Sequence, residues 1–64
     1  MKFNVPDMTC GHCVASITKA IKALDGDAQI MADLATRTVS VETSVAAPAV
    51  SRALAEAGYP STAA

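Results

Sequence analysis

The first half of the chain shows two hydrophobic patterns in succession, one typical of a strand and one typical of a helix. Phe3 and Val5 alternate with polar neighbours, which predicts a short half-buried strand that ends at Pro6. Beyond the two cysteines, apolar residues recur at spacings of three and four, which predicts an amphipathic helix. Its predicted inner face consists of Val14, Ile17, Ile21 and Leu24. We expect Gly26 to end this helix as a left-handed cap.

The middle of the chain returns to alternation. Residues 29–34 alternate, with Leu34 as the last apolar position on the inner side, and residues 38–42 alternate again. Residues 35–37 between them have the length of a tight turn. Two alternating segments joined by a short turn predict a β-hairpin.

A second helical pattern occupies much of the remaining chain. It begins near Pro48, a residue type that the first turn of a helix accepts, and Gly58 ends it. Its predicted inner face consists of Val50, Leu54 and Ala57. Residues 59–62 predict a last strand that is weak, because Pro60 has no N–H for the ladder. We expect the final two residues to be frayed.

The predicted elements follow the order strand, helix, strand, strand, helix and weak strand. This βαββαβ order predicts an α+β fold of ferredoxin-like topology, with two helices on one face of an antiparallel sheet. The chain contains no linker and no low-complexity tract, so we expect residues 1–64 to form a single domain.

Length and charge narrow the range of functions. A chain of 64 residues buries only roughly 60% of the surface that it exposes when unfolded, so a deep pocket for a large substrate is not expected. The formal net charge of −1 leaves no basic surface for nucleic acid. No apolar run approaches the ~20 residues of a membrane span, and the start of the chain does not read as a signal peptide. We therefore expect a cytoplasmic protein whose cysteines are thiols.

Cys10 and Cys13 form a C-x-x-C pair at the junction between a loop and the first predicted helix. The spacing lets both sulfurs converge on one point, and the N–H groups and dipole of a helix N-terminus favour thiolate over thiol. A cysteine in this setting is expected to have a lowered pKa. Two thiolates are soft ligands that prefer Cu(I), which accepts two ligands, with Zn(II) as the competitor. Structural zinc usually takes four ligands, and the chain has no second C-x-x-C.

The cysteine pair allows three interpretations. Two buried structural cysteines are the least favoured, because a pair beside Gly11 in a loop is poorly placed for a core. Thioredoxin-like redox chemistry also uses C-x-x-C at a helix start, but its fold needs a longer chain. A small βαββαβ domain offers no substrate pocket, which favours metal binding. A small thiol–disulfide oxidoreductase stays open as the alternative of a different class.

Residues 8–13, with the sequence Met-Thr-Cys-Gly-His-Cys, resemble the M-x-C-x-x-C motif of heavy-metal-associated domains. The resemblance extends over nearly the whole chain, through the order of the elements and the Ala-Gly-Tyr of residues 57–59. Within that family the chain is most similar to the stand-alone bacterial copper chaperones of the CopZ type. The resemblance implies a carrier, not an enzyme, that binds Cu(I) and transfers it to the metal-binding domains of a copper-transporting P-type ATPase. An excised domain of such a transporter is a less favoured alternative.

The resemblance also implies roles for individual residues. Cys10 and Cys13 match the two metal ligands, and Met8 matches a methionine that packs beneath the loop without ligating. Tyr59 matches a tyrosine near the metal loop that would shield and tune the sulfurs, with plain packing as the alternative. His12 lies between the ligands, where it could be a third ligand, or could face solvent and join a metal-bridged homodimer.

Two further features bear on selectivity and docking. Asp7 stands where the family usually has Gly, and its carboxylate could add an oxygen ligand that favours Zn(II). A Zn(II) or Cd(II) carrier, or a mercury carrier of the same fold, is therefore the alternative for the cargo. Lys19 and Lys22 lie one turn apart on the first helix, near the motif. They are candidates for docking to the transporter through weak, salt-sensitive contacts.

Overall fold

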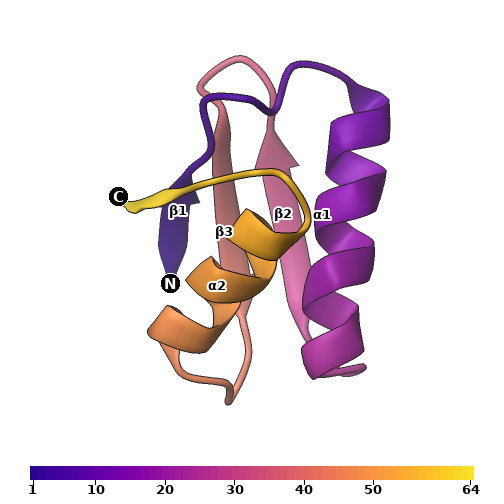
Figure 1. Ribbon diagram of the computed structural model, residues 1–64, viewed down its shortest axis with the longest axis vertical. Coiled ribbons are helices and arrows are strands. Elements are labelled where there is room, and N and C mark those ends of the chain that lie inside the picture. Colours follow the sequence, from indigo (N-terminus) through magenta and orange to yellow (C-terminus); the bar gives the residue numbers. More distant parts are fainter.

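The computed structural model describes residues 1–64, and its elements follow the predicted order (Figure 1). They are β1 (Lys2–Asn4), α1 (Gly11–Leu24), β2 (Gln29–Asp33), β3 (Thr38–Glu42), α2 (Ala47–Glu56) and β4 (Thr62–Ala63). The βαββαβ order predicted from the hydrophobic pattern is confirmed.

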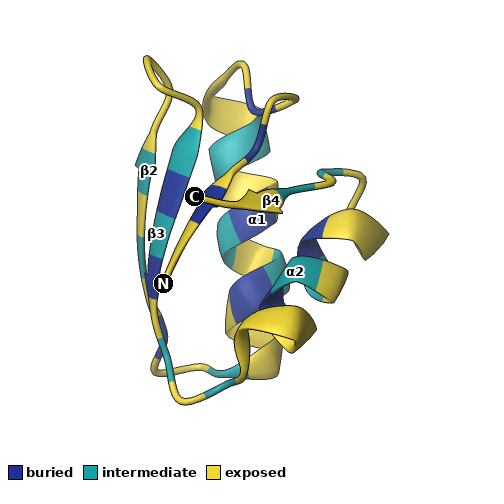
Figure 2. Cartoon of the chain, turned by 90° about the vertical axis from the view of Figure 1, so that its left-hand side faces the viewer, coloured by how far each residue is buried: buried dark blue, intermediate teal, exposed yellow.

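The four strands form one antiparallel sheet in the order β2-β3-β1-β4. Within it, Phe3 of β1 lies opposite Val39 of β3 on one side and opposite Ala63 of β4 on the other. The two helices contact each other and cover the same face of the sheet (Figure 2). This is the predicted ferredoxin-like arrangement. Neither helix has the length and hydrophobicity that a membrane span would need.

The core lies between the sheet and the helices, because each element turns its apolar positions inward. Val39 and Val41 alternate inward from β3, and Ile17 and Ile21 lie one turn apart on the inner face of α1. The buried residues are Phe3, Val5, Met8, Ile17, Ile21, Ala28, Val39, Val41, Val50 and Leu54. No polar or charged side chain is buried, so apolar burial is the main source of stability.

Three predicted inner positions at the ends of elements are exposed instead. Leu24 is the last residue of α1 and is 45% exposed, since no further helical turn covers it. Leu34 lies beyond the end of β2, in the turn, and is 42% exposed. Ala57 is exposed because α2 ends at Glu56 and Ala57 is its C-cap. The predicted pattern therefore holds for the element interiors and is wrong at these three ends.

The end of α1 does not use a left-handed glycine. Asp25 is the C-cap, with extended backbone (φ −151°), and its N–H donates to the Ile21 carbonyl at 3.1 Å. Its carboxylate accepts the backbone N–H of Asp27 at 3.0 Å, which closes the turn without positive φ. The prediction of Gly26 as a left-handed cap is therefore wrong. The prediction that Gly58 ends the second helix is confirmed, since α2 stops at Glu56, and Gly58 has the positive φ (+92°) that glycine adopts at such ends.

The last strand is weak, as predicted, but it begins later than expected. β4 contains only Thr62 and Ala63, because Pro60 has no N–H to donate and the strand starts beyond it. The final residue is not frayed, since the N–H of Ala64 donates to the Lys2 carbonyl at 3.0 Å. The chain end is therefore part of the sheet edge.

Candidate metal centre

Both cysteines lie where the loop from β1, residues 5–10, turns into α1 (Figure 1). We call residues 5–10 the cysteine loop; it ends at Cys10, and Cys13 lies in the first turn of α1. Cys10 is the N-cap: its backbone is extended (φ −154°, ψ 173°), and its carbonyl accepts the N–H groups of Cys13 and Val14 at 3.1 and 3.3 Å. Its side chain makes no capping hydrogen bond, so the thiol is left available. The predicted junction between loop and helix is confirmed.

The two sulfurs face each other at the surface. Their Sγ atoms are 3.4 Å apart, and neither cysteine is in a disulfide, which would require about 2.05 Å. A metal–thiolate bond is about 2.3 Å long, so a single ion could join two sulfurs up to about 4.6 Å apart. The pair therefore needs only a small opening to hold one ion. Cys10 is exposed and Cys13 is half-buried, so solvent and a partner can reach the site.

The pKa of Cys13 is lowered to about 6. The largest cause is the Tyr59 hydroxyl, which acts as a donor toward the sulfur, followed by the backbone N–H of Thr9 and the thiol of Cys10. Desolvation raises the pKa but is a smaller effect. Cys13 is therefore mainly a thiolate at neutral pH, the form that binds metal.

Tyr59 shows the reciprocal effect, because its pKa is raised, above all by Cys13. The phenol thus keeps its proton and can donate it in a hydrogen bond. The Cys13 sulfur also lies 3.4 Å from Cys10 Sγ and 3.7 Å from the Asp7 carbonyl, to which the thiol donates. Since a thiol donates and a thiolate accepts, the carbonyl of Asp7 serves the protonated sulfur and Tyr59 serves the thiolate.

Comparison with known proteins identifies the family of this site. Residues 2–60 match the model of the heavy-metal-associated domain. The chain belongs to this family. A curated relative, the COP-associated protein of Helicobacter felis, is 41% identical over 63 residues, which cover 92% of this chain and 96% of that protein.

Two solved structures share the fold of this heavy-metal-associated domain closely. The crystal structure of a gold-binding protein is 44% identical, with a TM-score of 0.97 over 100% of this chain and 98% of that one. A trimeric form of a variant of the copper chaperone Atx1 from Synechocystis PCC6803 is 27% identical, with a TM-score of 0.95 over 97% of this chain and 98% of that one. The family predicted from residues 8–13 is confirmed.

Two of the candidate residues of this heavy-metal-associated domain lie in or against the hydrophobic core. Met8 is fully buried in the core, and its N–H donates to the Val5 carbonyl at 3.0 Å, so it supports the loop from inside. Tyr59 is half-buried and packs against the same core, as does Cys13. Its packing and its effect on Cys13 thus occur together, and the two interpretations of Tyr59 are not exclusive.

His12 and Asp7 are both exposed, and neither side chain joins the cysteines. No group of three or more His, Cys, Asp or Glu side chains lies close enough together to hold a metal ion. Asp7 contacts the site through its backbone carbonyl, at 3.7 Å from Cys13 Sγ. In one copy of the chain, the structure therefore brings together two candidate ligands, Cys10 and Cys13.

The two candidate docking lysines differ in their distance from the cysteines. Both are exposed on α1, but Lys22 lies in its last turn, at the opposite end from the site. At about 1.5 Å of rise per residue, it is roughly 13 Å along the helix from Cys13. The expectation that both lie near the motif is therefore wrong for Lys22, where a cation also stabilises the helix C-terminus. Lys19 lies between the two ends.

Two residues near the site were not predicted from the sequence. The Ser16 hydroxyl lowers the pKa of Tyr59 and so opposes the effect of Cys13 on it. Its spacing of three from Cys13, which places both on one helix face, was the available signal. Arg37 donates from Nη1 to the Pro6 carbonyl at 3.2 Å, across 31 positions of sequence, and no local pattern predicts such a contact.

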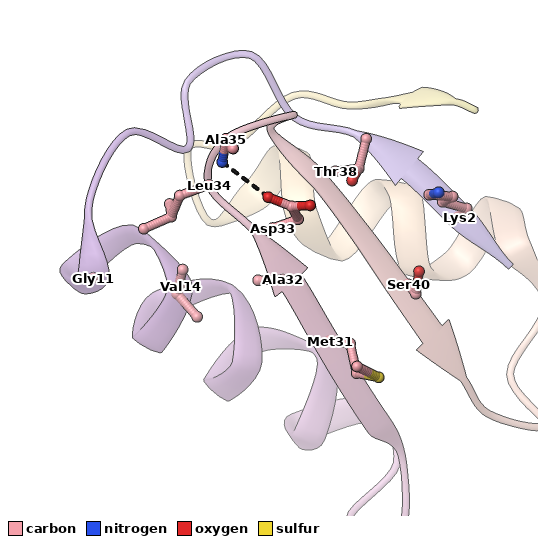
Figure 3. Close-up of a pocket in the computed structure, with 10 residues that line it drawn as sticks. All are labelled: Lys2, Gly11, Val14, Met31, Ala32, Asp33, Leu34, Ala35, Thr38 and Ser40. Carbon is pink, nitrogen blue, oxygen red and sulfur yellow. Dashed lines mark hydrogen bonds between the residues drawn. The ribbon is translucent and has the colours of Figure 1, made fainter.

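The groove on the surface is separate from the cysteines. It runs along β2 and is lined by Gly11 and Val14 of α1 together with strand and turn residues such as Ala32 and Leu34 (Figure 3). Neither cysteine lines it. The sulfur pair is therefore a surface site and not the floor of a cavity, which suits direct contact with another protein.

Proposed function

We propose that this protein is a carrier that binds Cu(I) through Cys10 and Cys13 and transfers it to the metal-binding domains of a copper-transporting P-type ATPase. The observation that supports this most strongly is the pair of free sulfurs, 3.4 Å apart and open to solvent, with no third side-chain ligand beside them. Membership of the heavy-metal-associated family and the likeness to a copper chaperone support it further.

The number of ligands supports Cu(I) over Zn(II). Cu(I) is soft and is satisfied by two thiolates, whereas zinc in proteins takes at least three protein ligands. The side chain of Asp7, the candidate oxygen ligand, does not join the sulfurs. We therefore propose that Asp7 contributes its backbone carbonyl to the loop and does not bind the cargo.

Transfer would proceed by exchange of ligands. A thiolate of the partner domain forms a bond to the two-coordinate Cu(I), which gives a three-coordinate bridge. One bond to Cys10 or Cys13 then breaks, its sulfur leaves as a thiolate, and a second exchange completes the transfer. Copper stays monovalent throughout, so no electron donor or acceptor is needed. A carrier of this kind performs no net chemical conversion and is not an enzyme.

Monovalent gold is a second candidate cargo. The gold-binding protein is 44% identical and superimposes over the whole chain with a TM-score of 0.97. Gold in this state is also soft and accepts two ligands in a line, so the same sulfur pair suits it. The titration described below therefore includes gold beside copper and zinc.

The exposure of the site also suits a metal-bridged homodimer. Two chains could share Cu(I) among four thiolates, and the exposed His12 could contribute at such an interface. The proposed compartment is the cytoplasm, where reducing conditions keep thiols free for exchange. Lys19 is the better placed of the two lysines to steer docking to the transporter domain.

The deciding experiment is an anaerobic competition titration. The reduced protein would compete for Cu(I), Au(I) and Zn(II) against chromophoric chelators, with size-exclusion chromatography at each loading. We expect Cu(I) to bind far more tightly than Zn(II), at one ion per chain or in a shared cluster. Tighter binding of Au(I) than of Cu(I) would favour gold handling. A preference for Zn(II) would contradict the proposal, and no binding at all would direct attention to disulfide chemistry at Cys10 and Cys13.

A further inference from the structure

The turn between β2 and β3 lies at the same end of the molecule as the cysteine loop (Figure 1). Its shape is fixed by side-chain hydrogen bonds. Asp33 Oδ1 accepts the N–H of Ala35 at 2.9 Å (Figure 3) and that of Thr36 at 3.4 Å, and the hydroxyls of Thr36 and Thr38 are 2.7 Å apart. An aspartate that accepts backbone N–H groups in this way stabilises a tight turn. The turn is therefore a well-ordered support beside the cysteine loop.

Arg37 ends this turn and holds the cysteine loop at two successive residues. Its carbonyl accepts the N–H of Val5 at 2.8 Å, and its guanidinium Nη1 donates to the Pro6 carbonyl at 3.2 Å. Its φ is +57°, and no other non-glycine residue of the chain has positive φ. A non-glycine residue in this region is uncommon, and here its backbone and its side chain contact the same loop.

The segment that Arg37 holds leads directly to the sulfur site. The Val5 carbonyl accepts the N–H of Met8, whose side chain is fully buried, so the start of the loop is tied to the core. The next carbonyl after that of Pro6 belongs to Asp7, and it is the one that accepts the thiol of Cys13 at 3.7 Å. The position of this carbonyl thus depends on the peptide group that Arg37 fixes.

We propose that Arg37 is a positioning residue for the metal site, and that its guanidinium, by bonding the Pro6 carbonyl, holds the cysteine loop ready before metal binds. The proposal rests on the proposed function, since it concerns the same two sulfurs. A loop that is already ordered loses less conformational entropy when the ion binds, so the affinity is higher. Residues that do not bind the metal themselves but hold its ligands in position commonly raise the metal affinity of a site.

The substitution Arg37→Gly separates this role from the shape of the turn. Glycine adopts positive φ without strain and keeps the carbonyl that accepts from Val5. The guanidinium and its bond to Pro6 are lost, and any effect of glycine on the stability of the whole fold is read from the core amides. The matched control is Arg52→Ala, which removes the other arginine, an exposed residue of α2 that pairs with Glu56 far from the turn in sequence.

The test measures amide hydrogen exchange in the metal-free protein by NMR, and then Cu(I) affinity by chelator competition. In Arg37→Gly we expect the Met8 amide to exchange about threefold to tenfold faster, which corresponds to the loss of one hydrogen bond. The Val39 and Val41 amides of the core are expected to stay unchanged. The dissociation constant for Cu(I) is expected to rise about threefold to tenfold, less than for a group bonded directly to a ligand. Arg52→Ala is expected to change neither quantity.

Equal exchange at Met8 in the wild type and in Arg37→Gly would overturn the proposal, whatever the affinity. Faster exchange at Met8 and at the core amides together would also overturn it, because that result means general destabilisation. Faster exchange at Met8 with an unchanged Cu(I) affinity would also overturn the proposal. It would show that the bond from Arg37 to Pro6 orders the loop without serving the metal site. Should the wild type itself not bind Cu(I), the proposed function fails, while the exchange rates still decide whether Arg37 orders the loop.

Discussion

Beside the cysteines, the exposed side chains of Asp7 and His12 form no hydrogen bond, whereas at the far end of α1 a side-chain hydrogen bond joins separate elements. The cysteine loop is held by backbone groups and by Arg37, while Cys10, His12 and Asp7 are exposed. At the far end of α1, the carboxylate of Asp25 accepts the hydroxyl of Thr43 at 2.6 Å and joins the helix to the segment before α2.

This difference implies that metal affinity and fold stability depend on different residues. A side chain that is committed to a hydrogen bond within the fold is not available to a metal or a partner, so the exposed polar side chains next to the sulfurs stay unpaired. The side-chain hydrogen bonds that hold the fold are made by other residues, in the β2–β3 turn and at the far end of α1. We therefore expect substitutions at the two ends to have opposite profiles, one changing affinity without stability and the other changing stability without affinity.

The largest effect is expected for Cys10→Ser and Cys13→Ser. Each replaces a soft thiolate with a hydroxyl, which is a poor ligand for Cu(I), so the affinity should fall by several orders of magnitude. The melting temperature should change little, because both residues lie outside the buried core. Chelator competition and thermal unfolding monitored by circular dichroism measure the two quantities. Wild-type affinity in either variant would place the metal site elsewhere.

The second prediction concerns Thr43→Val at the far end. The Thr43 hydroxyl is the largest cause that holds the pKa of Asp25 below its ordinary value. A carboxyl whose pKa is lowered on folding stabilises the fold above its ordinary pKa, and that contribution is lost as the pH falls through the lowered value. Thr43→Val should therefore lower the melting temperature by a few degrees at neutral pH. The difference should shrink in strongly acidic solution to the part that comes from the hydrogen bond of the Val45 N–H to the Thr43 hydroxyl at 3.2 Å, which does not depend on pH.

The control for Thr43→Val is Thr62→Val, which changes an exposed threonine in the short edge strand β4. It should leave both the melting temperature and its pH dependence near those of the wild type. Cu(I) affinity should be unchanged in both variants. A loss of affinity in Thr43→Val would show that the two ends are coupled, against the separation drawn above.

Much of the fold was predictable because burial follows the local period of each element. The alternation of Val39 and Val41 and the spacing of Ile17 and Ile21 are properties of neighbouring residues, and all four are buried as predicted. The end of the first helix was not predictable in the same way. Residues 25–27, Asp-Gly-Asp, suit a left-handed glycine or a turn closed by an aspartate, and the choice depends on the contact of Asp25 with a distant residue.

The contacts of the candidate site also differ in whether they join residues that are close together or far apart in sequence. The cysteine pair was predicted from its spacing, because two residues at i and i+3 at a helix start must lie close together. The contact of Tyr59 with Cys13 was implied only by the resemblance to a family, and the contact of Arg37 with Pro6 was not predicted at all. Each joins segments that are far apart in sequence, so only the packed fold defines it.

The smallest effect is expected for Tyr59→Phe, which keeps the ring that packs on the core and removes the hydroxyl. Because that hydroxyl is the largest cause of the low pKa of Cys13, the pKa should rise from about 6 toward the ordinary value of 9.0. The ultraviolet absorbance of the thiolate, followed against pH in a Cys10→Ser background, measures this with one sulfur present.

The consequence for Cu(I) binding has two parts of opposite sign. At pH 7 a higher pKa means that a proton competes with the metal for Cys13, which weakens binding, but a more basic thiolate also binds a metal ion more strongly once the proton is lost. At a pH above the pKa of Cys13 in both the wild type and the variant, proton competition is absent and only the stronger binding by the more basic thiolate remains. The affinity of Tyr59→Phe should therefore be slightly below that of the wild type at pH 6–7, and it should become equal or higher only at a pH above the raised pKa of the variant. An unchanged pKa for Cys13 would leave Tyr59 as a packing residue and assign the lowered pKa to the Thr9 N–H, the next cause in size.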